Sequence, residues 1–163
     1  MGKLQYREKN DYQRWIAEYK KRRDALRKEH NIPKAGKNSA PPDIIARLYN
    51  LTCKIKRWNR CLHKIARKEA ILIHAADCLR KYFDVDVHYS LPSKDKQLTL
   101  IRSIFVKYCM ERGVQGIYVS RFVNAKSVEW ASRVRLRFTR SFPNNAHNRH
   151  TYFKLKQFID EHC

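Results

Sequence analysis

A single apolar stripe dominates the pattern of hydrophobic and polar positions along this chain. From Ile44 to Phe83, twelve positions alternate steps of four and three residues, and eleven of them are apolar. These positions are Ile44, Leu48, Leu51, Ile55, Trp58, Leu62, Ile65, Glu69, Leu72, Ala76, Leu79 and Phe83. A seam with this period predicts one helix, about 60 Å long if it is unbroken.

The seam needs a partner, and the preceding residues offer one. Residues 4–30 predict a first helix with an apolar stripe that Arg22 interrupts. The stripe comprises Tyr12, Trp15, Tyr19 and Leu26. Residues 31–42 have the composition of a linker, with Ser39 as a candidate cap and prolines at the start of the next helix. We favour an antiparallel hairpin of the two helices; the alternative is a homodimer, in which two heptad helices form a coiled coil.

Shorter elements follow the seam. Residues 83–92 predict a connector, or a strand at most, and a helix follows at about 93–112. Its inward positions are Leu98, Ile101, Ile104, Phe105, Tyr108 and Cys109. The later elements are a turn bracketed by Gly113 and Gly116, a short helix at 117–123, a turn at 124–126, a helix from a capping Ser127 to about Ser141, and a last helix at 146–162. The apolar set of the last helix is Tyr152, Phe153, Leu155, Phe158 and Ile159.

These elements predict an all-α protein. Only four glycines and five prolines are present, which favours helices with few tight turns. The expected organisation is a long basic helical hairpin or coiled-coil arm at residues 1–83, followed by a helix-turn-helix bundle at residues 84–163.

Composition adds a strong positive charge to this picture. The formal net charge is +21, from 22 basic and 8 acidic residues in 1–83 and 14 basic and 7 acidic residues in 84–163. Four arginines fall within eight residues, at Arg133, Arg135, Arg137 and Arg140. Self-repulsion of this kind opposes folding, so a polyanionic partner is the economical explanation, and nucleic acid is the first candidate.

The arginine cluster lies on the second of two short predicted helices joined by a turn. In a helix-turn-helix, the second helix enters the major groove of duplex DNA and its first residues contact base edges. The predicted DNA-binding residues are Arg121, Lys126, Ser127, Glu129, Trp130, Arg133, Arg137, Arg140, His147, Arg149 and Lys154. The alternative is a solvated amphipathic helix. Its inner face would comprise Val128, Ala131, Val134, Leu136 and Phe138.

A second basic stripe follows the heptad helix. It comprises Arg47, Lys54, Arg57, Lys64 and Lys68. Such a stripe is usually a solvated face, and in a chain of this charge it is also a candidate for secondary contacts with phosphates.

Two segments resemble the start of the DNA-binding domain of the bacterial replication initiator DnaA. They are Leu-Arg-Lys-Tyr-Phe-Asp-Val-Asp-Val at residues 79–87 and Leu-Ile-Arg-Ser-Ile-Phe-Val-Lys-Tyr-Cys-Met-Glu-Arg at residues 100–112. The order of helices that follows, as far as residue 162, is also similar. The resemblance implies a stand-alone helix-turn-helix DNA binder, of the kind that a phage or mobile element encodes, acting in replication or transcription control.

The chain departs from that family at its signature turn. The family has Gly-Gly-Arg-Asp-His-Thr-Thr after a phenylalanine, whereas Val-Asn-Ala-Lys-Ser-Val-Glu follows Phe122. In a second register His147 lies five residues after Phe142, as in the signature, but neither register restores the arginine–aspartate pair. The family's sequence specificity is therefore not carried over. No phosphate-binding GxxxxGK[ST] motif occurs, so we expect no nucleotide hydrolysis.

Other chemistry has weaker support in the sequence. Five cysteines without framework spacing predict free thiols in a reducing compartment. Cys53, Cys61, His63, His74 and Cys78 lie within one helical pattern and lack a CxxC knuckle, so we expect no metal site. We expect no enzyme activity and no cofactor. A nuclease remains the enzymatic alternative, because His147 and His150 lie one turn apart beside basic helices.

The sequence predicts a protein that binds duplex DNA with sequence preference. The alternative is an RNA-binding or nucleic-acid-packaging protein, for which the basic hairpin and nine tyrosines are the argument. No apolar run approaches 18 residues and no signal peptide is evident, so we expect a cytoplasmic, nucleoid-associated protein that does not enter a membrane.

Overall fold

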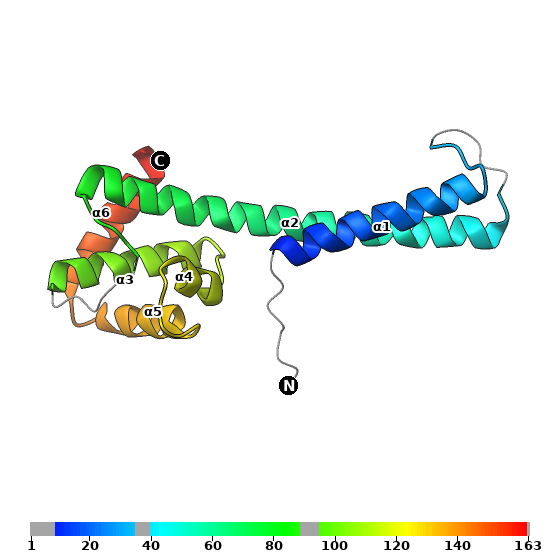
Figure 1. Cartoon of the computed structure of the whole chain (residues 1–163). Helices are drawn as coiled ribbons and strands as arrows, with labels where there is room; N and C mark the ends of the chain where they lie inside the picture. The colour runs from blue at the N-terminus through cyan, green and yellow to red at the C-terminus, as the bar shows by residue number, and fades with distance from the viewer. Residues whose placement is uncertain (1–8, 35–39, 89–94, 163) are drawn as a thin grey trace. The chain divides into compact units, whose positions relative to one another are not determined.

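The computed structural model describes residues 9–34, 40–88 and 95–162. All regular elements in these ranges are α-helices, so the all-α prediction is confirmed for them. They are α1 (Lys9–Glu29), α2 (Pro42–Phe83), α3 (Lys96–Glu111), α4 (Gly116–Phe122), α5 (Trp130–Ser141) and α6 (Ala146–His162) (Figure 1). The predicted cap Ser39 lies outside the described residues.

The chain divides into two compact units, Met1–Arg67 and Lys68–Cys163. The sequence pattern places the division at residue 83, where the long helix ends. The structure places it inside α2, because Leu72 and Leu79 of that helix belong to the hydrophobic core of the second unit.

In the first unit, α1 runs antiparallel to the first part of α2 (Figure 1). The ring of Trp58 lies 5.6 Å from that of Tyr12 and 5.2 Å from that of Trp15, measured between centroids. Further along α1, Leu26 packs in a small cluster with Ile44 and Leu48. Residue numbers that rise along α1 are therefore matched by numbers that fall along α2, which is the register of an antiparallel hairpin.

The long helix α2 is continuous over 42 residues, or about 63 Å at 1.5 Å per residue. Its heptad seam is its inner face: the buried seam positions are Ile44, Leu48, Ile55, Ile65, Leu72, Ala76 and Leu79. Phe83 is exposed at 39%, and the remaining seam positions are half-buried, namely Leu51, Trp58, Leu62 and Glu69. The helix ends there because Asp84 adopts a positive φ of 52°, and its N–H bonds to the carbonyl of Arg80 at 3.1 Å.

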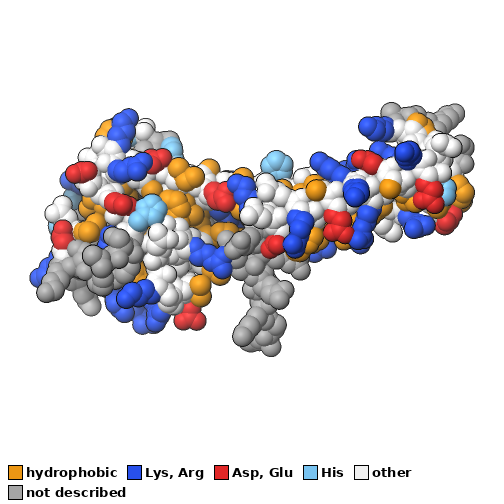
Figure 2. All heavy atoms as spheres, in the orientation of Figure 1, with side chains coloured by type: hydrophobic (Ala, Val, Ile, Leu, Met, Phe, Trp, Pro, Cys, Tyr) orange, Lys and Arg blue, Asp and Glu red, His pale blue; other side chains and the backbone are white. Residues whose placement is uncertain are grey.

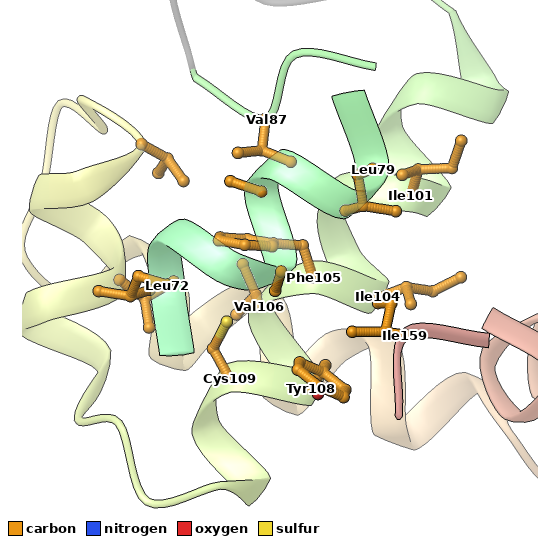
Figure 3. Close-up of a cluster of buried hydrophobic side chains, with 14 of the residues drawn as sticks. Leu72, Leu79, Val87, Ile101, Ile104, Phe105, Val106, Tyr108, Cys109 and Ile159 are labelled. Carbon is orange, nitrogen blue, oxygen red and sulfur yellow. The ribbon is translucent and has the colours of Figure 1, made fainter. Parts of the chain in front are cut away.

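The core of the second unit is built around α3 (Figure 3). Ile104, Phe105, Val106 and Cys109 have no exposed surface, because helices cover α3 on several sides. α4, α5 and α6 all pack against α3, and the last turns of α2 contribute Leu72 and Leu79 to the same core.

The predicted inner face of α6 needs one correction. Tyr152, Leu155 and Ile159 are buried as predicted, but Phe153 is 55% exposed. Phe153 follows Tyr152 directly and is therefore turned about 100° away from the face that packs on α3.

Candidate nucleic-acid interface

A tight turn joins α4 to α5. Asn124 adopts a left-handed backbone conformation with φ of 56°, which asparagine tolerates better than most residues. Its N–H bonds to the carbonyl of Arg121 at 3.0 Å, and the N–H of Ala125 bonds to the carbonyl of Ser120 at 2.8 Å. The chain thus reverses within a few residues, and α5 packs against both α3 and α4.

A buried serine fixes the start of α5. The hydroxyl of Ser120, on α4, donates a hydrogen bond to the carbonyl of Val128 at 3.1 Å. The same oxygen accepts a bond from the N–H of Ala131 at 3.0 Å, and the residue is only 1% exposed. Because buried polar groups of this kind are costly to leave unpaired, Ser120 holds α5 at a defined place on α4. No pattern in the sequence distinguishes this serine from a solvated one.

The close approach of α4 and α5 depends on Gly116. A Cβ atom at this position would lie 2.5 Å from the Ser132 hydroxyl oxygen and 3.3 Å from the terminal carbon of Met110. The backbone nitrogen of Ser132 would be 3.4 Å away. Glycine therefore allows the first residue of α4 to lie directly against the first turn of α5.

The structure corrects the predicted start of the arginine-rich helix. α5 begins at Trp130, and Ser127 lies in the turn before it. The Ser127 hydroxyl accepts a bond from the N–H of Glu129 at 3.3 Å and one from the Arg133 guanidinium at 3.0 Å. Lys126, Ser127 and Glu129 thus precede α5 as part of the turn. The serine stabilises the turn in place of capping the helix, because α5 begins three residues after it, at Trp130.

The inner face of α5 is narrower than the one expected for the alternative, a solvated amphipathic helix. Ala131 and Phe138 are buried and Val134 is half-buried, but Val128 is 51% exposed and Leu136 is 49% exposed. Leu136 lies midway between Val134 and Phe138, so it is directed away from the face that they share. The two apolar residues are therefore part of the outer surface of the motif.

The four arginines of α5 are all exposed. Figure 2 shows Lys and Arg side chains gathered over the α5 region of the second unit. Within the described residues, no ion pair involves Arg133, Arg135, Arg137 or Arg140. Their positive charge is therefore not neutralised by the fold, which is the electrostatic condition for binding a polyanion.

Trp130 and Arg137 lie on the flank of α5 that faces α3. Both line a pocket of about 400 Å³, to which α3 contributes Thr99, Arg102 and Ser103. Trp130 is half-buried there, so it is less available to an external partner than the sequence suggests.

The remaining predicted DNA-binding residues lie on α6 and α4. His147, Arg149 and Lys154 are exposed on α6, and Arg121 is exposed on α4. His147 lines a groove that Phe138 of α5 also lines, which brings it near the motif. Arg149 and Lys154 are exposed, as the arginines of α5 are.

Two other basic residues nearby are engaged in holding α6 to α3. Lys156 lies 3.3 Å from the carboxylate of Glu111, whose other oxygen accepts a bond from Lys107 at 2.6 Å. Arg112 pairs with Asp160, which also accepts a bond from the Tyr108 hydroxyl at 2.9 Å. Burial raises the pKa of Tyr108, and its bond to Asp160 adds to that rise. These cations are partnered within the protein and do not extend the arginine surface.

The second basic stripe lies mostly on the first unit. Arg47, Lys54, Arg57 and Lys64 are exposed along α2. Lys54 lies 5.2 Å from the centre of the Tyr19 ring, and Arg57 lies 5.4 Å from that of Trp58. Lys68 belongs to the second unit, where its ammonium lies 4.8 Å from the Tyr118 ring. The stripe thus has four exposed members on one unit and a half-buried fifth on the other.

The described residues offer little support for metal binding or catalysis. In the described parts of the chain, no three His, Cys, Asp or Glu side chains are close enough to hold a metal ion. The cysteines at positions 53, 61, 78 and 109 are free thiols. His147 and His150 are exposed on α6. Among the described helices, none combines the length and the apolar character needed to cross a bilayer.

No family model, curated protein or solved structure matches this chain.

Proposed function

We propose that this protein binds double-stranded DNA with sequence preference, with α4 and α5 acting as a helix-turn-helix and α5 as the recognition helix. The observation that carries the proposal is the set of four exposed, unneutralised arginines on one twelve-residue helix. That helix is held by the Ser120 bridge and the Gly116 contact, so the arginines are presented from a rigid support.

The dimensions of α5 suit the major groove. An α-helix with its side chains is about 10–12 Å across, and the major groove of B-form DNA is about 12 Å wide. Arginine donates paired hydrogen bonds to guanine and to phosphate, so one helix of this composition serves both positioning and readout. The residues assigned to this interface are Arg121, Lys126, Ser127, Glu129, Arg133, Arg137 and Arg140, with His147, Arg149 and Lys154 on α6 as outer phosphate contacts.

The structure favours duplex DNA over RNA as the partner. The major groove of A-form RNA is too narrow for side chains to read, and single-stranded RNA is recognised largely by stacking on exposed aromatic rings. The described tyrosines are two exposed, three half-buried and two buried residues: Tyr49 and Tyr82, then Tyr12, Tyr19 and Tyr118, then Tyr108 and Tyr152. Two of these seven rings are therefore exposed enough for a base to stack on them.

We place the activity in replication or transcription control, without nucleotide hydrolysis. Layout-level resemblance to the DnaA DNA-binding domain supports this assignment. A role in packaging nucleic acid is the second candidate, and the exposed stripe at Arg47, Lys54, Arg57 and Lys64 favours it, because contacts with phosphates need no base reading.

Fluorescence anisotropy tests the proposal directly. Labelled duplex DNA, single-stranded DNA and duplex RNA of equal length are titrated with the full chain over a range of salt concentrations. We expect the preference for duplex DNA to persist near physiological salt, where contacts with phosphates alone are screened. Equal binding to all three, lost together as salt rises, would contradict a recognition helix and favour packaging.

A further inference from the structure

A stripe of four exposed residues runs along the outer side of α5, beginning at Glu129, which directly precedes the helix and already has a helical backbone conformation. It comprises Glu129, Arg133, Leu136 and Arg140, at successive steps of four, three and four residues. These steps place the four side chains on one face of a helix. We call this set the outer stripe. It lies opposite the buried Ala131 and Phe138, so nothing within the motif covers it.

Leu136 is the residue of this stripe that the fold does not explain. Isolated exposed leucines are ordinary on protein surfaces. This one is 49% exposed, contributes nothing to the core cluster, and stands between two arginines that repel each other. A polar residue would be more favourable on a face that is exposed to water. On a face that is covered by DNA, an apolar side chain can contact an apolar group of a base.

The geometry points to the outer stripe as the part of α5 that reads bases, with a target in which a thymine lies between two guanines. This inference rests on the proposed function and names the target of the same surface. In the major groove, arginine pairs with the O6 and N7 atoms of guanine, and an apolar side chain contacts the C5-methyl group of thymine. A carboxylate accepts a hydrogen bond from the N4 amino group of cytosine, so Glu129 extends the same readout by one position.

The spacing along the helix fits neighbouring base pairs. At 1.5 Å per residue, Arg133 and Leu136 are about 4.5 Å apart along the axis, and Leu136 and Arg140 about 6 Å. Base pairs are stacked about 3.4 Å apart. Each arginine therefore lies one to two base pairs from the leucine, and the whole stripe covers about five base pairs.

Arg133 is oriented before any DNA is bound. Its guanidinium donates a hydrogen bond to the Ser127 hydroxyl at 3.0 Å, which ties it to the turn and leaves its remaining donors for a base. Arg137 occupies a different place, on the flank that lines the pocket with Thr99 and Ser103 of α3. Arg133 is thus a base reader and Arg137 a phosphate contact, although both are exposed arginines of one helix.

Replacing thymine by uracil tests the leucine, because it removes a methyl group from the DNA and changes nothing else. The site is first selected from a random duplex library with the full chain. Its affinity is then measured with thymine and with deoxyuridine at the central position. For the unaltered protein we expect affinity to fall about fourfold with deoxyuridine, the worth of one buried methyl group.

For the Leu136→Ala variant, the difference in affinity between the thymine duplex and the deoxyuridine duplex should vanish. Phe153→Ala is the matched control, because it removes an equally exposed apolar side chain from α6 and should keep the fourfold difference. A Leu136→Ala variant that keeps the difference overturns the inference, and so does a selected site without a thymine between guanines. Failure of the proposed function is a separate result, since it appears as no preference for duplex DNA in the unaltered protein.

Arg133→Ala and Arg137→Ala form a second matched pair with the same change of charge. Arg133→Ala should relax the preference at one guanine, by about tenfold or more against the other bases. Arg137→Ala should weaken binding to all duplexes by one common factor. Equal, sequence-independent losses in both variants would overturn the assignment of the stripe.

Discussion

The two units of this protein are both basic, and they use their charge in different ways. Met1–Arg67 holds 19 basic and 6 acidic residues, and Lys68–Cys163 holds 17 and 9. In α1 several arginines are paired with acids of the same helix, as Arg14 is with Asp11 and Arg22 with Glu18. On α5 the arginines have no such partners within the described residues. Net charge therefore does not distinguish the proposed interface. Exposed cations without an ion pair occur in both units among the described residues, because Arg47, Lys54, Arg57 and Lys64 on α2 also lack one. The proposed interface is distinguished by the support of its helix.

The support also differs. Among the described residues, the hydrophobic cluster of the first unit has four buried members and that of the second has twenty, so the arginines of α5 are held by a far larger core. A side chain that reads bases must be held within a fraction of an ångström, which a large core provides. Contacts with phosphates tolerate more freedom, which suits the exposed stripe of the hairpin.

Truncating a core side chain should have the largest effect on stability, and the size of the loss should differ between the two units. Phe105→Ala removes a ring with no exposed surface and should lower the free energy of unfolding of the second unit by about 3–5 kcal/mol. Leu48→Ala, in the small cluster of the first unit, should cost about 2 kcal/mol, because a thin core relaxes more easily. Hydrogen exchange resolved by helix measures both; equal losses of protection in the two units would contradict the comparison.

The Ser120 bridge should matter next. Ser120→Ala leaves the buried N–H of Ala131 without its partner and should cost about 1–3 kcal/mol of stability. Its effect on DNA affinity should be larger than that of Thr139→Ala, which removes an exposed hydroxyl from the same motif. Urea unfolding and anisotropy measure the two quantities, and a Ser120→Ala variant as stable as Thr139→Ala would show that the bridge does not hold α5.

Periodicity predicted most of the helices, and it did so for a physical reason. The seam from Ile44 to Phe83 repeats for many turns, so local irregularities average out and one continuous helix follows. At Ser127 the same reasoning placed the start of the arginine-rich helix three residues too early. A serine before an apolar run is a cap in one conformation and a turn residue in another, and the Ser120 hydroxyl, distant by several residues, decides between them.

The charges of the candidate site were predictable from the sequence, but the side chains of α5 that face the core were not. The sequence placed the arginines on a short helix after a turn, and only the alternative of a solvated amphipathic helix assigned Val128 and Leu136 to the inner side. Burial of α5 is set by how α3 and α4 cover it, and this depends on packing between distant segments. The contrast between Arg133 and Arg137 has the same origin, because α3 lies beside only one of them.

Acid should weaken the second unit through Glu111. Burial raises the pKa of the Glu111 carboxyl, but its hydrogen bonds with Lys107, Tyr152 and Lys156 lower the pKa by more. The net pKa therefore lies below the ordinary 4.5. Stability from a depressed carboxyl pKa is present above the unfolded pKa and is lost as pH falls through the folded one. Glu111→Gln should therefore cost up to about 1 kcal/mol at neutral pH, a gap that closes as pH falls below 4.5.

Unfolding curves at a series of pH values measure this gap. Glu161→Gln, an exposed carboxyl of α6, is the control. A gap for Glu111→Gln that stays constant from neutral pH to pH 3 would contradict the assignment of the α3–α6 network as a pH-dependent contact.

The smallest expected effect is that of the hairpin stripe. Lys54→Ala with Lys64→Ala should weaken binding of all duplexes by a similar, modest factor, and should lower the salt slope of the binding constant by about 2. Anisotropy titrations in a series of salt concentrations measure the slope. An unchanged slope would remove the first unit from the interface.

The most direct test of the central claim compares two double variants that each remove two positive charges. One is Arg133→Ala with Arg140→Ala on α5, and the other is Lys54→Ala with Lys64→Ala on α2. Each is titrated against the selected duplex and against a shuffled duplex at one salt concentration. We predict that the arginine pair abolishes the preference between the duplexes, while the lysine pair lowers both affinities and keeps their ratio. An arginine variant that retains the preference would contradict the account.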